Sequence, residues 1–335
     1  MEKLFKLLLA GALTLSLAAC GSNSASTENK TDNKATAEPA AESSDLDFYF
    51  ISLMTGGAAW SRAEKGFNDA CEELGINGQF LAPVERNNLV EMVTLLDQAV
   101  TQEADAVIGV YASTETFGPS LLNAKEKGIV TASVQLKLDS QYIDFMIGTN
   151  QTQIGIEMAN ALLEYSGDKD TTVMFLCGSA GEITNMQYEA FCKTLEGHDN
   201  ITVLDMKFDD GAAATANQVI SDEYTANPDL NAVVCLDSSA ATIGAASFVE
   251  ERGLQDEWTV IGIDASADIL NYVKNGALTA TMNQDFYKMG HDSVVMAYEL
   301  IKNGTQPPFE NDSGCYLIRP EDVDAYAKAN GIELK

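Results

Sequence analysis

Apolar and polar residues follow two alternating periods along the chain, and together they predict a repeated strand–helix arrangement. Continuous apolar runs such as DFYFISL (47–53) and ADAVIGVY (104–111) are typical of strands that are buried on both faces. After the first run, apolar residues recur at helical spacing, as in Ala63, Phe67 and Leu74. The pattern predicts parallel sheets with helices on both faces.

The strands fall into two series. The expected strands of the first series are 47–53, 78–82, 104–111, 129–134 and 144–149, and those of the second are 171–177, 201–208, 231–237 and 258–264. The tail then adds a strand at 279–284, a helix at 285–302 and a strand-like run at 314–320. Two series of this kind predict an α/β protein with two doubly wound parallel-sheet lobes.

Three crossings between the lobes are expected, near 148–151, 282–284 and 307–312. They assign residues 45–149 plus 283–307 to an N-terminal lobe and residues 150–282 plus 308–335 to a C-terminal lobe. Such crossings are hinges that absorb backbone rotation while the lobes move as rigid bodies.

The first 44 residues have a different composition. Residues 1–19 carry a positively charged start and an apolar run, which predicts a signal peptide. The run ends in LAAC, which resembles the lipobox of bacterial lipoproteins and implies that Cys20 carries lipid, palmitate included. Residues 21–44 contain no aromatic residue and predict a disordered tether, so that 20–44 is a lipid-anchored linker. We therefore expect the folded part to be anchored on the extracytoplasmic face of the cell membrane.

Charge and cysteine content narrow the class of partner. The formal net charge of −30 excludes nucleic acid, which requires a basic surface. Four arginines in the whole chain are a thin supply for a phosphate or carboxylate site. The six cysteines show no metal-binding spacing, and we expect neither a metal nor a cofactor.

The residues that follow each strand form the candidate site, because ligands of open α/β sheets bind at the carboxyl ends of the strands. These positions are Thr55–Trp60, Tyr111–Thr114, Gln135, Gly178–Asn185, Asp237 and Asp264. They are polar and rich in hydroxyl groups, with one large aromatic residue. No G-x-G-x-x-G or Gly-Lys-Ser/Thr is present, so the glycine-rich turn before Trp60 does not predict a phosphate loop.

Several motifs in this order and spacing resemble the type I periplasmic sugar-binding proteins, the ribose- and galactose-binding group that serves ABC importers. They are GFNDACEELG (66–75), EKGIVTASVQ (126–135), IGTNQTQIG (147–155), NAVVCLDSSAATIGA (231–245), VIGIDAS (260–266) and ATMNQ (280–284). The stretch MTGGAAWSRAEKGF (54–67) is most similar to the branch that contains rhamnose-type and furanosyl quorum-signal binders.

The resemblance implies roles for the acidic and aromatic candidates. Asp264 matches an aspartate that accepts hydrogen bonds from sugar hydroxyls, and Asp237 occupies the neighbouring strand end. Trp60 lies where the family stacks an aromatic ring on the sugar. The alternatives are a packing role for Trp60 and helix N-caps for the two aspartates.

The resemblance also implies roles for the amide candidates. Gln284 matches a glutamine at the last crossover, Asn185 a polar ligand group and Asn150 the first hinge crossing. Gln135 departs from the family, which commonly has aspartate there, so the preferred sugar stays open. Gln135, Asn185 and Gln284 could each be purely structural. Asp209–Asp210 is expected in a solvated turn.

These observations predict a solute-binding lipoprotein that closes on a monosaccharide-like ligand and delivers it to an ABC permease. We expect it to act as a monomer and not as an enzyme. The chain has two histidines and no G-x-S-x-G elbow, although paired aspartates also occur in glycosidases. The alternative functions are a sensor subunit that presents a sugar or quorum signal to a membrane kinase, and a nucleoside-binding lipoprotein.

Overall fold

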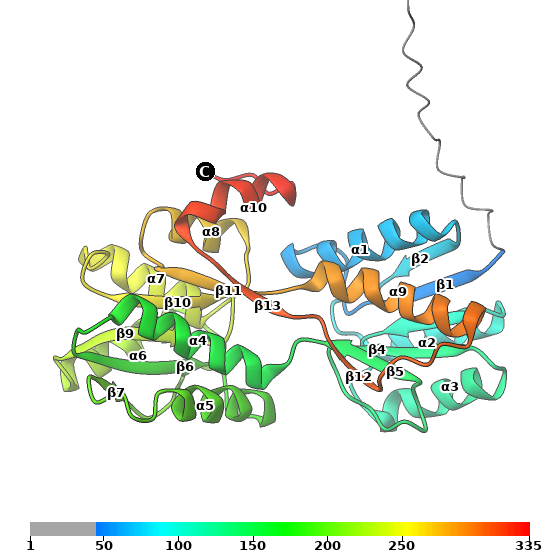
Figure 1. The fold of residues 1–335 in the computed structure, drawn as a ribbon, viewed down its shortest axis with the longest axis horizontal. Helices are drawn as coiled ribbons and strands as arrows, with labels where there is room; N and C mark the ends of the chain where they lie inside the picture. Colours follow the sequence, from blue (N-terminus) through cyan, green and yellow to red (C-terminus); the bar gives the residue numbers. More distant parts are fainter. Residues whose placement is uncertain (1–44) are drawn as a thin grey trace, which may run out of the picture. The chain divides into compact units, whose positions relative to one another are not determined.

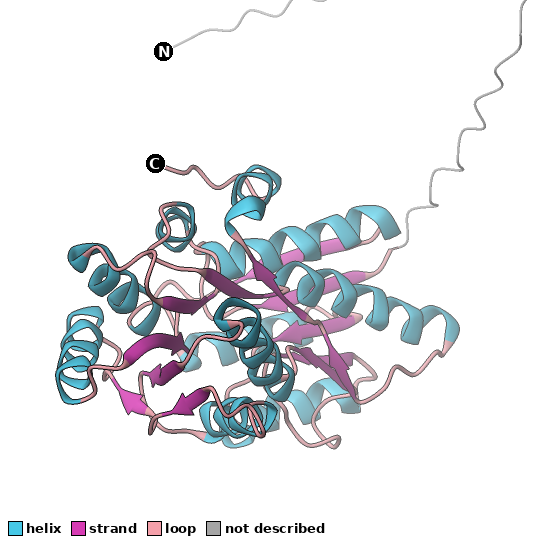
Figure 2. Cartoon of the chain, turned by 60° about the vertical axis from the view of Figure 1, so that its left-hand side comes forward, coloured by secondary structure: helices cyan, strands magenta, loops and turns pink. Residues whose placement is uncertain are grey.

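The computed structural model describes residues 45–335 and contains two separate sheets. The predicted signal peptide, Cys20 and the tether lie outside the described residues. Helices cover both faces of the strands, as Figure 2 shows. The predicted fold class, α/β with two doubly wound sheets, is confirmed.

The first sheet has the strand order β12-β5-β4-β3-β1-β2, and all its pairs are parallel. Its strands are β1 (Asp47–Ile51), β2 (Asn77–Leu81), β3 (Ala106–Gly109), β4 (Val130–Val134), β5 (Phe145–Gly148) and β12 (Glu310–Asp312). The helices that pack on it are α1 (Ala58–Leu74), α2 (Leu89–Thr101), α3 (Thr114–Glu126) and α9 (Phe286–Asn303). One apolar cluster lies under α1 and α9, and another lies under α2 and α3.

The second sheet has the order β13-β11-β10-β9-β6-β7, with β8 also paired to β6. Its strands are β6 (Thr171–Cys177), β7 (Ile201–Val203), β8 (Lys207–Phe208), β9 (Leu230–Cys235), β10 (Thr259–Ile263), β11 (Ala280–Gln284) and β13 (Cys315–Ile318). Its helices are α4 (Gln151–Ser166), α5 (Glu182–Thr194), α6 (Ala213–Ala226), α7 (Ala241–Arg252), α8 (Ala267–Lys274) and α10 (Val323–Ala329), the last preceded by a 3₁₀ turn at Pro320–Asp322. Only β13 among these strands runs antiparallel, against β11.

Two expectations about the strands are wrong in detail. The single strand predicted at 201–208 is divided into β7 and β8, which pair with β6 at its start and its end. Residues 310–312 were expected in the C-terminal lobe, but β12 pairs with β5 of the first sheet. The chain therefore reaches the second sheet at Ser313–Gly314 and not before. The full lobe boundaries stay a prediction.

The crossings are hydrogen-bonded to one another. Oδ1 of Asp312 accepts from the backbone N–H of Asn150 at 3.0 Å and from that of Gly314 at 2.9 Å. The Asn150 side chain caps α4 by accepting from the backbone N–H of Gln153 at 3.2 Å. Asn150 thus lies at a crossing, as expected, and its role as a hinge stays a prediction.

Helices α1 and α9 lie side by side and pack backbone to backbone (Figure 1). The contact is possible because two glycines face the partner helix. A Cβ on Gly66 would lie 2.0 Å from the carbonyl oxygen of Tyr287, and one on Gly290 would lie 2.0 Å from that of Ala63. These helices carry the residues on the first-sheet side of the cavity described below.

We expect Gly290→Ala to destabilise the protein by about 1–3 kcal/mol, because the added methyl group forces the two helices apart. Gly181→Ala is the matched control, since a Cβ there would meet only Oγ1 of Thr184 at an ordinary 3.7 Å. Urea unfolding of both variants measures the difference. Equal stability of the Gly290 and Gly181 variants would contradict the close approach of α1 and α9.

Candidate ligand-binding site

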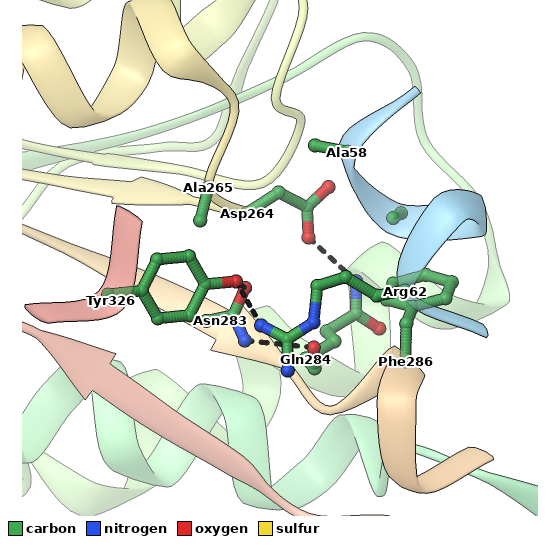
Figure 3. A pocket seen from close by; sticks show the side chains of 9 residues that line it. Ala58, Arg62, Asp264, Ala265, Asn283, Gln284, Phe286 and Tyr326 are labelled. Carbon is green, nitrogen blue, oxygen red and sulfur yellow. Dashed lines mark hydrogen bonds between the residues drawn. The ribbon is translucent and has the colours of Figure 1, made fainter. Parts of the chain in front are cut away.

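A small cavity lies where α1, the ends of β10 and β11, the start of α9 and α10 meet (Figure 3). Its lining residues are Ala58, Ala59, Arg62, Asp264, Ala265, Asn283, Gln284, Phe286 and Tyr326. The cavity encloses about 10 Å³, which is room for about one water molecule.

Three of the predicted site residues form a hydrogen-bonded chain. Nε2 of Gln135 donates to Oε1 of Gln284 at 3.2 Å, and Nε2 of Gln284 donates to Oδ1 of Asp264 at 3.2 Å. Gln135 follows β4 of the first sheet, whereas Gln284 and Asp264 lie at strand ends of the second. The chain of bonds therefore joins the carboxyl edges of the two sheets.

Gln135 and Asp264 are both held in the left-handed backbone region, with φ of 67° and 63°. Residues other than glycine seldom adopt this conformation, and they do so mostly where the surrounding structure imposes it. At Asp264 the backbone N–H donates to the carbonyl of Met282 at 2.7 Å, and Oγ1 of Thr281 donates to the Asp264 carbonyl at 2.7 Å. These bonds to β11 fix the turn that presents the carboxyl group.

Burial raises the pKa of the Asp264 carboxyl, and the hydrogen bond from Gln284 opposes this shift. Few hydrogen-bond donors surround the Asp264 carboxyl group, chiefly the side chains of Gln284 and Ser238. Such a group gains more than an exposed one from ligand hydroxyls that donate to it.

Asp237 is oriented by the start of α7. Its Oδ1 accepts from the backbone N–H groups of Ala240 at 2.6 Å and Ala241 at 3.0 Å. The N-cap residue of α7 is Ala240, so the N-cap alternative is wrong for Asp237, although its carboxyl group binds the N–H groups at the start of this helix. Its Oδ2 is buried and has no hydrogen-bond partner.

Of the predicted ligand-binding residues, Asp264 and Gln284 line the cavity, whereas Trp60, Gln135, Asn185 and Asp237 do not. Trp60 is half-buried on the first turn of α1, and its ring meets the Phe286 ring edge to face with centroids 5.2 Å apart. Phe286, not Trp60, lines the cavity. The side chain of Asn185 is exposed on the first turn of α5.

Five lining residues were not predicted from the sequence, namely Ala265 and four residues with larger side chains. Arg62 and Phe286 lie on the first-sheet side, while Asn283 and Tyr326 lie on the second-sheet side. Arg62 is two positions after Trp60 and Asn283 directly precedes Gln284, so proximity in the sequence could have suggested both. Tyr326 is on α10, a helix that no pattern had predicted.

Arg62 links α1 to the tail of the chain. Its Nη1 donates to the Tyr326 hydroxyl and, at 3.4 Å, to the Tyr316 hydroxyl; its Nη2 is 3.7 Å from Oδ1 of Asp285. The Tyr326 hydroxyl donates to Oδ1 of Asn283 at 3.3 Å (Figure 3). Nε of Arg62 is buried and has no partner, so it is a free donor beside the cavity.

Within residues 45–335, no cluster of histidine, cysteine or acidic side chains is suited to hold a metal ion.

The comparison with known protein families covers most of the described chain. The model of the periplasmic binding protein domain matches residues 48–306. The chain belongs to this family. The matched residues include most strands of both sheets, and they include Asp264 and Gln284 of the site.

Curated relatives of this family member are binding proteins for sugars and polyols. It is 21% identical to the D-allose-binding periplasmic protein of Escherichia coli, over 78% of this chain and 87% of the relative. It is 22% identical to the xylitol-binding protein of Mycolicibacterium smegmatis, over 85% of this chain and 76% of the relative.

Solved structures show the same fold. An arabinose-binding protein from Geobacillus stearothermophilus superimposes with a TM-score of 0.78 at 20% identity, over 84% of this chain and 99% of the other. A solute-binding protein from Actinobacillus succinogenes with bound D-allose gives a TM-score of 0.72 at 20% identity, over 84% and 100%. The prediction of a type I periplasmic sugar-binding protein is confirmed at the level of family and fold, and the quorum-signal branch stays a prediction.

Proposed function

We propose that this protein captures a monosaccharide-like ligand between its two sheets and delivers it to an ABC importer. The hydrogen-bonded chain of Gln135, Gln284 and Asp264 supports this function most directly, because it links a polar group of the first sheet to two polar groups that line the cavity. The names of the relatives, which are binding proteins for allose, xylitol and arabinose, support the ligand class.

The polar groups suit a neutral polyol. The Asp264 carboxylate accepts hydrogen bonds only, so hydroxyl groups of the ligand donate to it, whereas Gln135 and Gln284 both donate and accept. In this structure these side chains bond to one another. A sugar would replace those bonds with bonds to its own hydroxyls, which keeps each buried polar group paired.

The cavity of about 10 Å³ cannot hold a sugar ring, so binding requires its walls to separate. We propose that the crossings at Asn150, Asp285 and Gly314 act as the hinge. The bonds from Asn150 and Gly314 to one oxygen of Asp312 would hold two of the crossings together during this motion.

An aromatic wall completes the proposed site. The apolar C–H face of a sugar ring packs well on an aromatic face. Phe286 lines the cavity, and the Trp60 ring packs against the Phe286 ring. We propose that Trp60 itself reaches the ligand once the walls separate. Asn185 and Asp237 are proposed ligand groups of the second-sheet wall in the same state.

We propose binding without catalysis. Nε2 of His291 lies 3.1 Å from Oε2 of Glu73, and Nδ1 lies 3.0 Å from Oδ1 of Asp292, on the outer side of α1 and α9. These contacts engage both ring nitrogens away from the cavity. His198 lies in the turn after α5, where its backbone N–H donates to the carbonyl of Leu195 and its carbonyl accepts from the N–H of Ile201.

A thermal-shift screen over pentoses, hexoses, polyols and nucleosides tests the proposed function. A sugar at 100 times its Kd should stabilise the protein by about 2.7 kcal/mol, which appears as a higher melting temperature. Stabilisation by nucleosides alone would favour the nucleoside-binding alternative. Hydrolysis of the bound sugar would overturn the proposal in favour of an enzyme.

Asp264→Ala and Trp60→Ala should weaken binding in different ways. Loss of the Asp264 carboxylate leaves ligand hydroxyls unpaired, which costs about 1.5–3 kcal/mol, or roughly ten- to hundredfold in Kd. The loss should be large for a sugar with the matching hydroxyl and small for its deoxy analogue. Loss of the Trp60 ring should weaken both sugars by a similar factor.

Titration calorimetry of both variants against a sugar and its deoxy analogue measures these losses. Asp268→Ala is the control, because that carboxylate is exposed on the first turn of α8. Equal losses for both sugars at Asp264 would make it a structural residue, and unchanged binding at Trp60 would reduce the ring to packing against Phe286.

We also propose that Cys20 anchors the protein by its lipid on the extracytoplasmic face of the membrane. No helix within residues 45–335 is long and apolar enough to cross a bilayer. Because Cys20→Ala removes the residue that would carry the lipid, the variant should move from the membrane fraction to the soluble fraction. Immunoblotting of the two fractions measures this, and a Cys20→Ala variant that stays in the membrane fraction would refute the anchor.

A further inference from the structure

Asp209 is buried at the carboxyl edge of the second sheet, where a solvated turn was expected. The exposed fraction of the residue is 0%, whereas the next residue, Asp210, is exposed. The expectation was wrong because the Asp-Asp-Gly sequence follows β8, whose pairing with β6 draws Asp209 into the sheet edge. The backbone N–H of Asp209 continues this pairing by donating to the carbonyl of Cys177 at 3.0 Å.

Asp209 meets Asp237 across the end of β6. Strands β8 and β9 pair with opposite sides of β6, so the residues that follow them flank Gly178. A Cβ on Gly178 would lie 3.8 Å from Oδ1 of Asp209, an ordinary contact distance, so Gly178 is a direct neighbour of this carboxyl group. The side chain of Asp237 is near enough to raise the pKa of the Asp209 carboxyl group.

Each carboxyl group has one oxygen bound to backbone N–H groups and one oxygen without a donor. Oδ1 of Asp209 accepts from Gly211 at 2.8 Å, and Oδ1 of Asp237 accepts from Ala240 and Ala241. Both Oδ2 atoms are buried and lack a hydrogen-bond partner. Two ionised carboxylates in this position would repel each other, whereas one proton between the Oδ2 atoms would satisfy both.

We propose that Asp209 is a positioning residue that shares one proton with Asp237 and thereby holds the ligand-binding edge of the second sheet in place. The proton comes from solvent and lies between the two Oδ2 atoms. The inference does not depend on the identity of the ligand.

The position of Asp237 is coupled to that of Asp264. The carbonyl of Asp237 accepts from Oγ1 of Thr242 at 2.7 Å, and that hydroxyl oxygen accepts from the backbone N–H of Ile263 at 3.2 Å. Ile263 directly precedes Asp264. A displacement of Asp237 is therefore transmitted to the carboxylate that faces the cavity.

The electrostatic surroundings support a retained proton. Burial, aided by the charges of Asp237 and Asp210, raises the pKa of Asp209 to about 6 against the opposing bond from Gly211. Asp264 adds negative charge beside Asp237.

The thiols of Cys177 and Cys235 also face the Asp209–Asp237 pair. Burial raises the pKa of each thiol, to about 11 for Cys177, so both are uncharged at neutral pH. The nearest cation along β8, Lys207, pairs with Glu223 at 2.8 Å.

Asp209→Asn tests the shared proton, because the amide supplies the same hydrogen at every pH. A group whose pKa is raised on folding stabilises the protein below its unfolded pKa, and this contribution is lost as the pH rises through the folded pKa. The unfolding equilibrium constant of the native chain should therefore rise between about pH 4 and pH 8, by about 100-fold relative to that of the Asp209→Asn variant. Each unit by which folding raises the Asp209 pKa contributes a factor of ten. Urea unfolding of the full chain across this range measures it.

Two further variants make the test independent of how well Asp209→Asn folds. In Asp237→Asn the amide at position 237 supplies the hydrogen to Asp209, so this variant should also lose the pH dependence. Asp210→Asn, at the exposed neighbour, should keep the native profile. A pH dependence in both single variants equal to that of the native chain would overturn the proposal.

The double variant Asp209→Asn/Asp237→Asn gives the sharpest result. Both Oδ1 atoms still have to accept from backbone N–H groups, so two amide donors would face each other where one hydrogen is needed. The loss of stability should exceed the sum of the two single losses. Additive losses would show that no hydrogen is shared, and would overturn the proposal.

Discussion

The hydrogen-bonded chain from Gln135 through Gln284 to Asp264 is the link on which the candidate site depends, because it joins the two sheets at their carboxyl edges. Gln284 ends a strand, and Gln135 and Asp264 follow theirs in the left-handed backbone region. This conformation turns the side chain away from the sheet at once. Amides and a carboxylate in these positions can form hydrogen bonds to one another without a ligand, or to the hydroxyls of a ligand when one is bound.

The second sheet carries an unusual concentration of carboxyl groups at this edge. Asp209, Asp237 and Asp264 follow three of its strands, and burial works against the ionisation of Asp209 and Asp264. Hydroxyl recognition needs an ionised acceptor at Asp264. A proton shared by Asp209 and Asp237 would lower the total charge beside it. Asp264 can then stay ionised for the ligand without repulsion from two further ionised carboxylates at the same edge.

The first-sheet side of the site depends on helix packing. Gly66 and Gly290 let the backbones of α1 and α9 touch. This contact places Arg62 and Trp60 beside Phe286, although α1 and α9 lie near opposite ends of the folded chain. Arg62 then reaches the tyrosines of the tail. One close contact between helices thus connects the glycine-rich turn, the aromatic wall and the end of the chain.

The sequence by itself determined the two series of buried strands, the fold class and the polar strand ends, because each of these depends on local periodicity or on the parallel sheet. Gln135 and Asp264 could be predicted as site residues for that reason, whereas Gln284 was predicted from the resemblance to the family. Only the tertiary structure decided that Phe286 lines the cavity in front of Trp60, that Tyr326 reaches it, and that β12 belongs to the first sheet. It also decided that Asp209 is buried against Asp237 and not solvated. These features arise from contacts between segments far apart in the chain, where neither periodicity nor composition specifies which side chain faces which.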